Sequence, residues 1–161
     1  MFEAKFTNAA LLKKIVEAIK ELVSEAPFDC TENSMCLQAM DGSHVALISL
    51  KLDIGLFEVF RCDRTIALGL SMGELSKVLK CSKSEDTLMI RFEDSEQDMV
   101  TFTFEDTKGR KQDITLKLMD RVRLSMCDNV PLVVEYDIEG NGFLRFFLAP
   151  KIDEDKETMD D

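Results

Sequence analysis

The sequence has little of what most catalytic and metal sites are built from. Its 161 residues include one histidine, five cysteines and no tryptophan, and no two cysteines form a Cys-x-x-Cys pair. Because a structural zinc site needs a full set of Cys or His ligands at regular spacing, neither a metal nor another cofactor is expected. No paired base or glycine-rich phosphate loop accompanies His44, so enzymatic activity is not expected. The dispersed thiols are expected to be reduced core residues.

Long hydrophobic runs are also absent. No segment approaches the roughly 18 consecutive apolar residues of a membrane-spanning helix. The first residues, Met1–Phe6, lack the basic region and apolar block of a secretory signal. We therefore expect an intracellular protein with no membrane association.

Positive charge is scarce, since 20 lysines and arginines stand against 31 acidic residues and the net charge is −11. Such a chain is repelled by polyanions in free solution. Its lysines nevertheless gather on two predicted helices. Lys13, Lys14 and Lys20 lie opposite the apolar face of a helix predicted over residues 9–23. Lys77 and Lys80 lie opposite the apolar face of a helix predicted over residues 72–80, so both helices are expected to line one surface.

Capping signals support both helices. Asn8 is a suitable N-cap for the first helix, and Ser71 with Glu74 forms a capping box for the second. The residues expected to face the core are Leu11, Leu12, Ile15, Val16, Ile19, Leu22 and Val23 in the first helix and Met72, Leu75, Val78 and Leu79 in the second. For the lysines taken alone, an ordinary solvated face with Glu17 paired to Lys13 and Lys20 is the plainer explanation.

The rest of the chain is typical of short strands separated by polar turns. Strands are expected over residues 2–7, 27–30, 35–40, 45–52, 56–61, 65–70, 87–92, 99–104, 112–119, 121–127, 131–138 and 142–148. The last six form two meanders of three strands each, and only the first meander is preceded by helices. This order predicts an α+β fold with two helices on one face of antiparallel sheets.

Several short segments carry a more specific signal. They are Met1-Phe-Glu-Ala4, Leu12-Lys-Lys-Ile15, Leu37-Gln-Ala-Met-Asp41, Arg61-Cys-Asp-Arg64, Leu75-Ser-Lys-Val-Leu-Lys-Cys81, Lys117-Leu-Met-Asp120, Val130-Pro-Leu-Val-Val-Glu-Tyr136 and Leu148-Ala-Pro-Lys-Ile152. They resemble the proliferating cell nuclear antigen family of DNA sliding clamps. The resemblance implies a complete N-terminal clamp domain (1–120), the last three strands of a truncated C-terminal clamp domain (121–150) and an acidic tail (151–161). The interdomain linker and the first part of the family's second domain have no counterpart in this chain. A natural isoform, a paralogue or a coding-prediction error would each produce such a gap.

The resemblance implies a DNA polymerase processivity factor, acting in nuclear DNA replication and repair, that holds duplex DNA without sequence specificity. The implied DNA-facing residues are Lys13, Lys14, Lys20, Arg61, Arg64, Lys77 and Lys80. The alternative is a truncated clamp fragment that binds or sequesters replication partners without forming a ring.

A second implied site captures short hydrophobic peptide motifs of DNA polymerase and other replication and repair proteins, and a clamp loader is a further implied partner. Its residues are Met40, His44, Val45, Pro131, Phe147, Leu148, Ala149 and Pro150. Packing within the sheet is the other explanation for Met40, Val45 and Phe147. Because the linker that forms one wall is missing, we expect weak capture.

The family assembles as a ring of three subunits. The resemblance implies that the strand over residues 112–119 pairs with a strand of the neighbouring subunit that this chain lacks. It also implies that strand 142–148 pairs with strand 45–52, which leaves the inner face of the last meander, expected from residues 132–134 and 146–147, partly uncovered. We therefore expect a monomer or an ill-defined oligomer rather than a stable homotrimer, with an open edge at residues 112–119.

Overall fold

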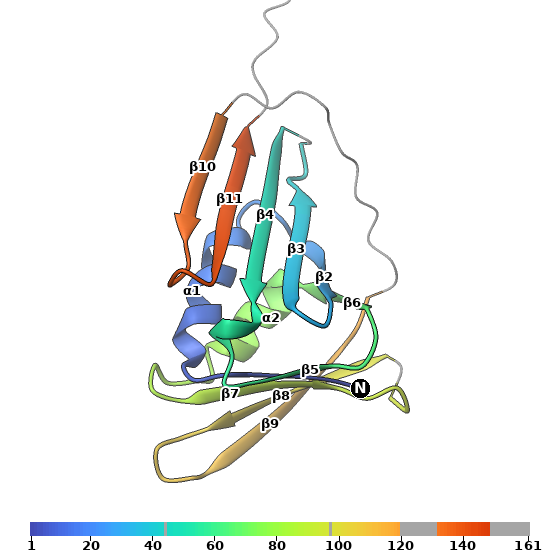
Figure 1. Ribbon diagram of the computed structural model, residues 1–161, viewed down its shortest axis with the longest axis vertical. Helices are drawn as coiled ribbons and strands as arrows, with labels where there is room; N and C mark the ends of the chain where they lie inside the picture. The colour runs from blue at the N-terminus through green and yellow to red at the C-terminus, as the bar shows by residue number, and fades with distance from the viewer. Residues whose placement is uncertain (44, 97, 120–131, 149–161) are drawn as a thin grey trace, which may run out of the picture.

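The computed structural model describes residues 1–43, 45–96, 98–119 and 132–148. Within these ranges the chain forms short strands and two α-helices (Figure 1). Their bounds are β1 Phe2–Phe6, α1 Ala9–Ile19, β2 Glu25–Cys30, β3 Ser34–Met40, β4 Ala46–Asp53, β5 Val59–Cys62, β6 Ile66–Ser71, α2 Met72–Leu79, β7 Thr87–Phe92, β8 Met99–Glu105, β9 Lys111–Lys117, β10 Leu132–Asp137 and β11 Gly142–Leu148, with a short 3-10 helix at Ile54–Leu56.

The strands form two antiparallel sheets. The five-stranded sheet has the order β5-β1-β7-β8-β9, and the six-stranded sheet has the order β10-β11-β4-β3-β2-β6. In Figure 1 the six-stranded sheet stands at a steep angle to the five-stranded sheet, with α1 and α2 behind the former and above the latter. The predicted α+β fold is therefore confirmed. Neither helix in the described ranges is long and apolar enough to cross a membrane.

Both helices begin at the predicted caps. The side chain of Asn8 accepts a hydrogen bond of 2.8 Å from the backbone N–H of Ala10. The hydroxyl of Ser71 accepts one of 3.3 Å from the backbone N–H of Glu74. Each cap provides an acceptor for one of the N–H groups that a helix leaves unpaired at its start.

The predicted end of the first helix was wrong, since α1 stops at Ile19 and not at residue 23. The N–H groups of Leu22 and Val23 both bond to the carbonyl of Ile19, each at 3.0 Å, so the chain turns sharply there. The turn returns Val23 to the core but leaves Leu22 39% exposed. A helical continuation would have placed both side chains on one stripe, which is why periodicity alone extended the helix.

The start of the strand predicted over residues 56–61 was also wrong. The N–H of Phe57 bonds to the carbonyl of Ile54 and closes the 3-10 turn, so β5 begins only at Val59. The Phe57 ring packs on Phe6 and Phe60, with ring centroids 4.7 Å and 4.9 Å apart. Its contacts with aromatic side chains therefore favour the turn over an extended strand.

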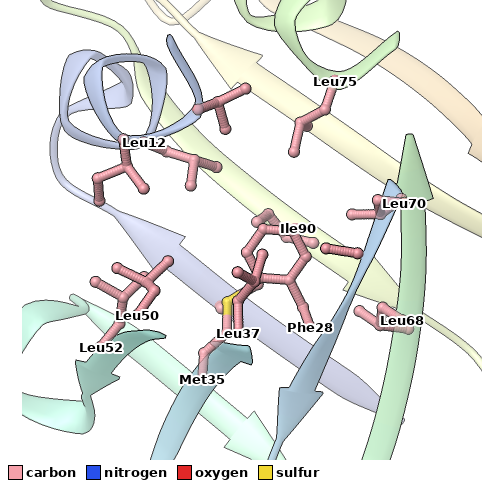
Figure 2. Close-up of a cluster of buried hydrophobic side chains, with 14 of the residues drawn as sticks. Leu12, Phe28, Met35, Leu37, Leu50, Leu52, Leu68, Leu70, Leu75 and Ile90 are labelled. Carbon is pink, nitrogen blue, oxygen red and sulfur yellow. The ribbon is translucent and has the colours of Figure 1, made fainter. Parts of the chain in front are cut away.

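One hydrophobic core joins both sheets and both helices (Figure 2). The inward residues predicted for the second helix, Met72, Leu75, Val78 and Leu79, are all buried, as are Leu12, Ile15, Val16 and Ile19 of α1. The sheets contribute fully buried side chains such as Phe28, Leu37, Leu50 and Phe102. Burying each large apolar side chain contributes about 1.5–3 kcal/mol, so the core fixes the helices against the sheets.

Strand β11 lies beside β4, which confirms the implied pairing of strand 142–148 with strand 45–52. Leu144 lies opposite Leu50, and Phe147 lies opposite Leu47. Leu144 is buried and Phe146 packs against the core. Because successive side chains of a strand point to opposite faces, Phe147 lies on the outer face, so its predicted place on the inner face was wrong. The first strand of the last meander, predicted over 121–127, and the tail over 151–161 lie outside the described residues.

Candidate nucleic-acid interface

Glu17 joins the two helices. Its carboxylate accepts a hydrogen bond of 2.8 Å from the Ser76 hydroxyl of α2 and forms an ion pair of 2.7 Å with the ammonium of Lys20. The hydrogen bond from Lys20 and then that from Ser76 lower the pKa of the Glu17 carboxyl, and the nearby charge of Lys80 acts in the same direction. Since Lys20 follows α1 and Lys80 follows α2, lysines of both helices approach one carboxylate.

The other lysines of the helix pair are open to solvent. Lys14, Lys77 and Lys80 are exposed, and Lys13 is half-buried. A groove of about 420 Å³ beside α1 brings Lys13 and Lys14 together with a residue from the loop after α2, Lys83. Its lining is Ala10, Lys13, Lys14, Glu17, Ser82, Lys83 and Ser84. In this groove the lysines outnumber the single carboxylate, so its local charge is positive despite the net negative charge of the chain.

Sequence reasoning missed Lys83. It follows α2 in a short polar turn and so lies outside the helical spacing that singled out Lys77 and Lys80. No sequence pattern places this turn beside the first helix. The N–H of Ala9, at the start of α1, bonds to the carbonyl of Asp86 at 2.8 Å, which fixes the turn beside the first helix.

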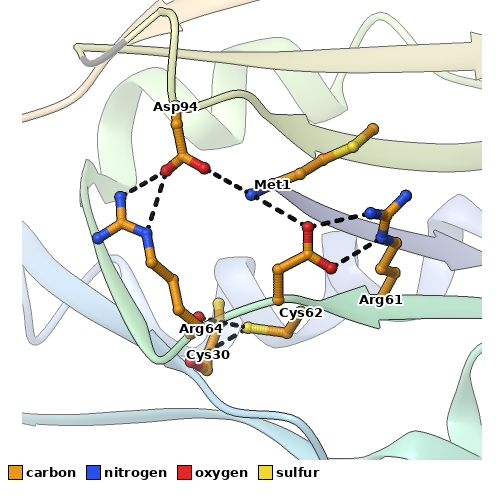
Figure 3. A network of polar contacts seen from close by, with 7 residues as sticks. Met1, Cys30, Arg61, Cys62, Arg64 and Asp94 are labelled. Carbon is orange, nitrogen blue, oxygen red and sulfur yellow. Dashed lines mark hydrogen bonds and ion pairs between the residues drawn. The ribbon is translucent and has the colours of Figure 1, made fainter.

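The two predicted arginines lie elsewhere, at the edge of the five-stranded sheet (Figure 3). Arg61 of β5 donates two hydrogen bonds to Asp63, of 2.8 Å and 3.0 Å. Arg64 donates to Asp94 at 3.1 Å, and the Met1 amine donates to the same carboxylate at 2.9 Å. The Met1 amine and then Arg64 lower the pKa of Asp94.

These arginines are therefore held by carboxylates of their own. In the described part of the chain, Arg61 and Arg64 form ion pairs with Asp63 and Asp94, and neither forms one with a carboxylate of α1 or α2. The turn after β5, which carries Arg64, is fixed from inside by the Cys62 thiol, which donates to the carbonyl of Arg64 at 2.9 Å. A phosphate would therefore share or compete for each guanidinium group with a carboxylate of this chain.

The predicted peptide site is represented by a row of side chains on the outer face of the six-stranded sheet. Met40 of β3 lies opposite Leu47 of β4, and Leu47 lies opposite Phe147 of β11. All three are partly exposed, and Val45 beside them is 50% exposed. We call Met40, Leu47 and Phe147 the apolar row. Predicted members His44, Pro131, Ala149 and Pro150, and the Leu148 side chain, lie outside what the structure describes.

Leu47 was missed from the sequence, although its signal was present. In β4 the alternate residues Leu47, Ser49 and Lys51 share one face, and a leucine on this otherwise polar face stands out. Asp41 orders the preceding turn, since its carboxylate accepts hydrogen bonds from the N–H groups of Val45 and Ala46 at 2.8 Å and 3.0 Å. No cluster of three or more metal-ligating side chains occurs among the described residues.

Two helices packed on antiparallel sheets, with lysines on the helices, agree with the domain type expected of a DNA sliding clamp. The sequence profile described as "Proliferating cell nuclear antigen, N-terminal domain" matches residues 1–124. The chain therefore belongs to the proliferating cell nuclear antigen family.

Individual relatives carry the same name. The chain is 39% identical to "Proliferating cell nuclear antigen" of Caenorhabditis elegans in an alignment of 264 positions that covers 99% of this chain and 100% of the relative. Because this alignment is far longer than the 161-residue chain, a large part of the nematode protein has no counterpart here. Identity is 54% to "Proliferating cell nuclear antigen" of Dictyostelium discoideum and 46% to "Proliferating cell nuclear antigen 2" of Drosophila melanogaster, each over 74% of this chain and 47% of the relative. The chain thus matches about half the length of these two relatives.

Proposed function

We propose that this chain is a non-enzymatic DNA polymerase processivity factor of the clamp type, which contacts duplex DNA through α1 and α2 and recruits replication and repair proteins in the nucleus. The observation that carries the proposal is the joining of the two helices at Glu17, which gathers Lys13, Lys14, Lys77 and Lys80 on one helical layer. Family membership supports the same role.

The chemistry of the lysines suits non-specific contact with DNA. Ammonium groups on flexible stems attract phosphates but read no base sequence. The net charge of −11 repels DNA from the molecule as a whole, which disfavours tight, immobile binding. Contact through the lysine layer alone would allow the protein to stay near the duplex and still move along it.

The test is the salt dependence of DNA binding by charge-matched variants. Lys14→Ala/Lys77→Ala removes two cations from the helix pair, and Lys108→Ala/Lys111→Ala removes two from the β8–β9 hairpin. The helix variant is expected to reduce the slope of log K against log salt concentration by about 0.9 for each phosphate that its two lysines neutralise. The hairpin variant should leave the wild-type slope unchanged. Equal slopes for both variants would refute the assignment of the DNA-facing surface.

We further propose that the apolar row receives the aromatic or aliphatic anchor of partner peptides. Three partly exposed apolar side chains in register on adjacent strands offer a shallow contact surface, and the polar residues around them favour a defined position for the peptide. Polymerase, other replication and repair proteins and a clamp loader would dock there. Because the resemblance implies that this chain lacks the strand that would pair with β9 of a neighbouring copy, a closed ring of three copies is not part of the proposal.

A further inference from the structure

Strand β9 ends the five-stranded sheet and leaves one side of its backbone open. The N–H of Leu118 bonds to the carbonyl of Asp98 at 2.7 Å, and the N–H of Asp106 bonds to the carbonyl of Arg110 at 3.0 Å. Because backbone direction alternates along an antiparallel pair, the even-numbered residues of β9 bond to β8. The odd-numbered residues direct N–H and C=O groups to the open edge, where no described residue meets them.

The side chains of β9 restrict what can add to this edge. Ile114 and Leu116 face inward and pack against the core. Asp113, Thr115 and Lys117 are exposed on the other face. An added strand must therefore bring apolar side chains to one face and charges of the right order to the other.

We propose that the added strand is β9 of a second copy of this chain, in a two-fold antiparallel pairing with Asp113 of each copy opposite Lys117 of the other. Thr115 lies on the two-fold axis in this register. Ile114 of each copy then lies opposite Leu116 of the other copy, so the apolar faces of the two sheets form one continuous surface across the junction. Lysine at an edge normally deters pairing with another chain, but here each Lys117 finds a carboxylate.

Charge and the apolar face together select this register among those that the backbone permits. With Ile114 on the axis, Lys111 would lie opposite Lys117, and with Asp113 on the axis, two aspartates would meet. With Leu116 on the axis, Lys117 would lie opposite Thr115 and neither ion pair would form. The register centred on Gln112 would oppose Lys111 and Asp113, but it would place Ile114 opposite Arg110, a cation beyond the start of β9. Only the register centred on Thr115 opposes unlike charges and also keeps Ile114 opposite Leu116, and like charges opposite each other destabilise a strand pair.

The pairing has a consequence for the shape of the assembly. Two antiparallel strands are related by an axis perpendicular to their sheet, so the helices of both copies lie on the same face of the joined sheet. The dimer would extend the helix-lined wall of one copy into a longer arc. This inference goes beyond the proposed function and does not depend on it, because β9 self-pairing needs no DNA.

The test is sedimentation equilibrium of the full chain without DNA, over a range of concentrations. The wild type is expected to show a monomer–dimer equilibrium. In the dimer, Asp113→Lys and Lys117→Asp each replace two pairs of opposite charges by two pairs of like charges. Each variant alone should therefore dimerise at least about tenfold more weakly than the wild type. A mixture of the two variants restores every unlike pair, and so does the double variant D113K/K117D; both should dimerise like the wild type.

A second variant tests the backbone part of the proposal. The Thr115 N–H points to the open edge and makes no bond to β8, so Thr115→Pro should abolish dimerisation and leave the fold intact. Far-UV circular dichroism and the melting temperature check the fold of every variant. Wild-type chain that stays monomeric or forms trimers, charge variants that dimerise normally, or a mixture that fails to associate would each overturn the proposal.

Discussion

Ser76 and Glu17, 59 residues apart in the sequence, are joined by a hydrogen bond of 2.8 Å that ties α2 to α1. Ser76 is 4% exposed, so its hydroxyl would be poorly solvated without this acceptor. Glu17 in turn positions Lys20, which approaches it at 2.7 Å. One polar contact between the helices therefore also organises the lysine layer.

Replacing Ser76 by alanine tests this arrangement. Ser76→Ala is expected to lower the melting temperature slightly, because it removes one hydrogen bond to a charged group while the helix propensity improves. It is also expected to raise the pKa of Glu17 toward its ordinary value, since Ser76 is one of the groups that lower it. The titration of Glu17 followed by NMR measures this shift. An unchanged Glu17 titration in Ser76→Ala would show that the contact does not persist in solution.

Acid should weaken the network around Asp94. The folded-state pKa of this carboxyl is lowered by the Met1 amine and Arg64, so its stabilising effect is complete above the unfolded value of about 3.9 and is lost as pH falls through the lower folded value. The urea midpoint of wild type should therefore exceed that of Asp94→Asn at pH 6, and the two should converge toward pH 2. A constant difference between the two midpoints across this range would contradict the prediction.

Gly142 controls the docking of β11 on β4. A Cβ atom at this position would collide with the backbone carbonyl oxygen of Lys51, whereas one at Gly42 would meet nothing. Gly142→Ala is expected to cost about 1–3 kcal/mol of unfolding free energy, because the start of β11 must shift away from β4. Gly42→Ala is the matched control and should be close to neutral. Hydrogen exchange of the β11 amides provides the local measurement, and equal protection in both variants would count against this account.

Leu47 should matter for partner binding as much as the residues that the sequence singled out. Leu47→Ser removes the middle of the apolar row and is expected to weaken binding of an aromatic-anchored peptide about tenfold. The control is Leu22→Ser, which changes an exposed leucine in the turn after α1. Fluorescence anisotropy of a labelled peptide measures both affinities. If the two variants bind alike, the apolar row is not the docking surface.

Much of the local structure followed from sequence patterns alone. Helical spacing located α1 and α2, the caps at Asn8 and Ser71 fixed their starts, and alternation located most strands. These signals work because the periods of helix and strand decide which side chains share a face. They failed at Leu22, where backbone bonds to Ile19 end the helix, and at Phe57, where aromatic packing favours a turn.

By itself, the sequence determined the α+β class, the lysines opposite each helix's apolar face and the family to which the chain belongs. Only the tertiary structure placed Lys83 beside α1 and paired Arg61 and Arg64 with carboxylates. It also decided that Leu47 lies between Met40 and Phe147 and that β9 ends its sheet. Periodicity describes a single element, whereas contacts between elements depend on how the core packs and on which strand edges find a partner.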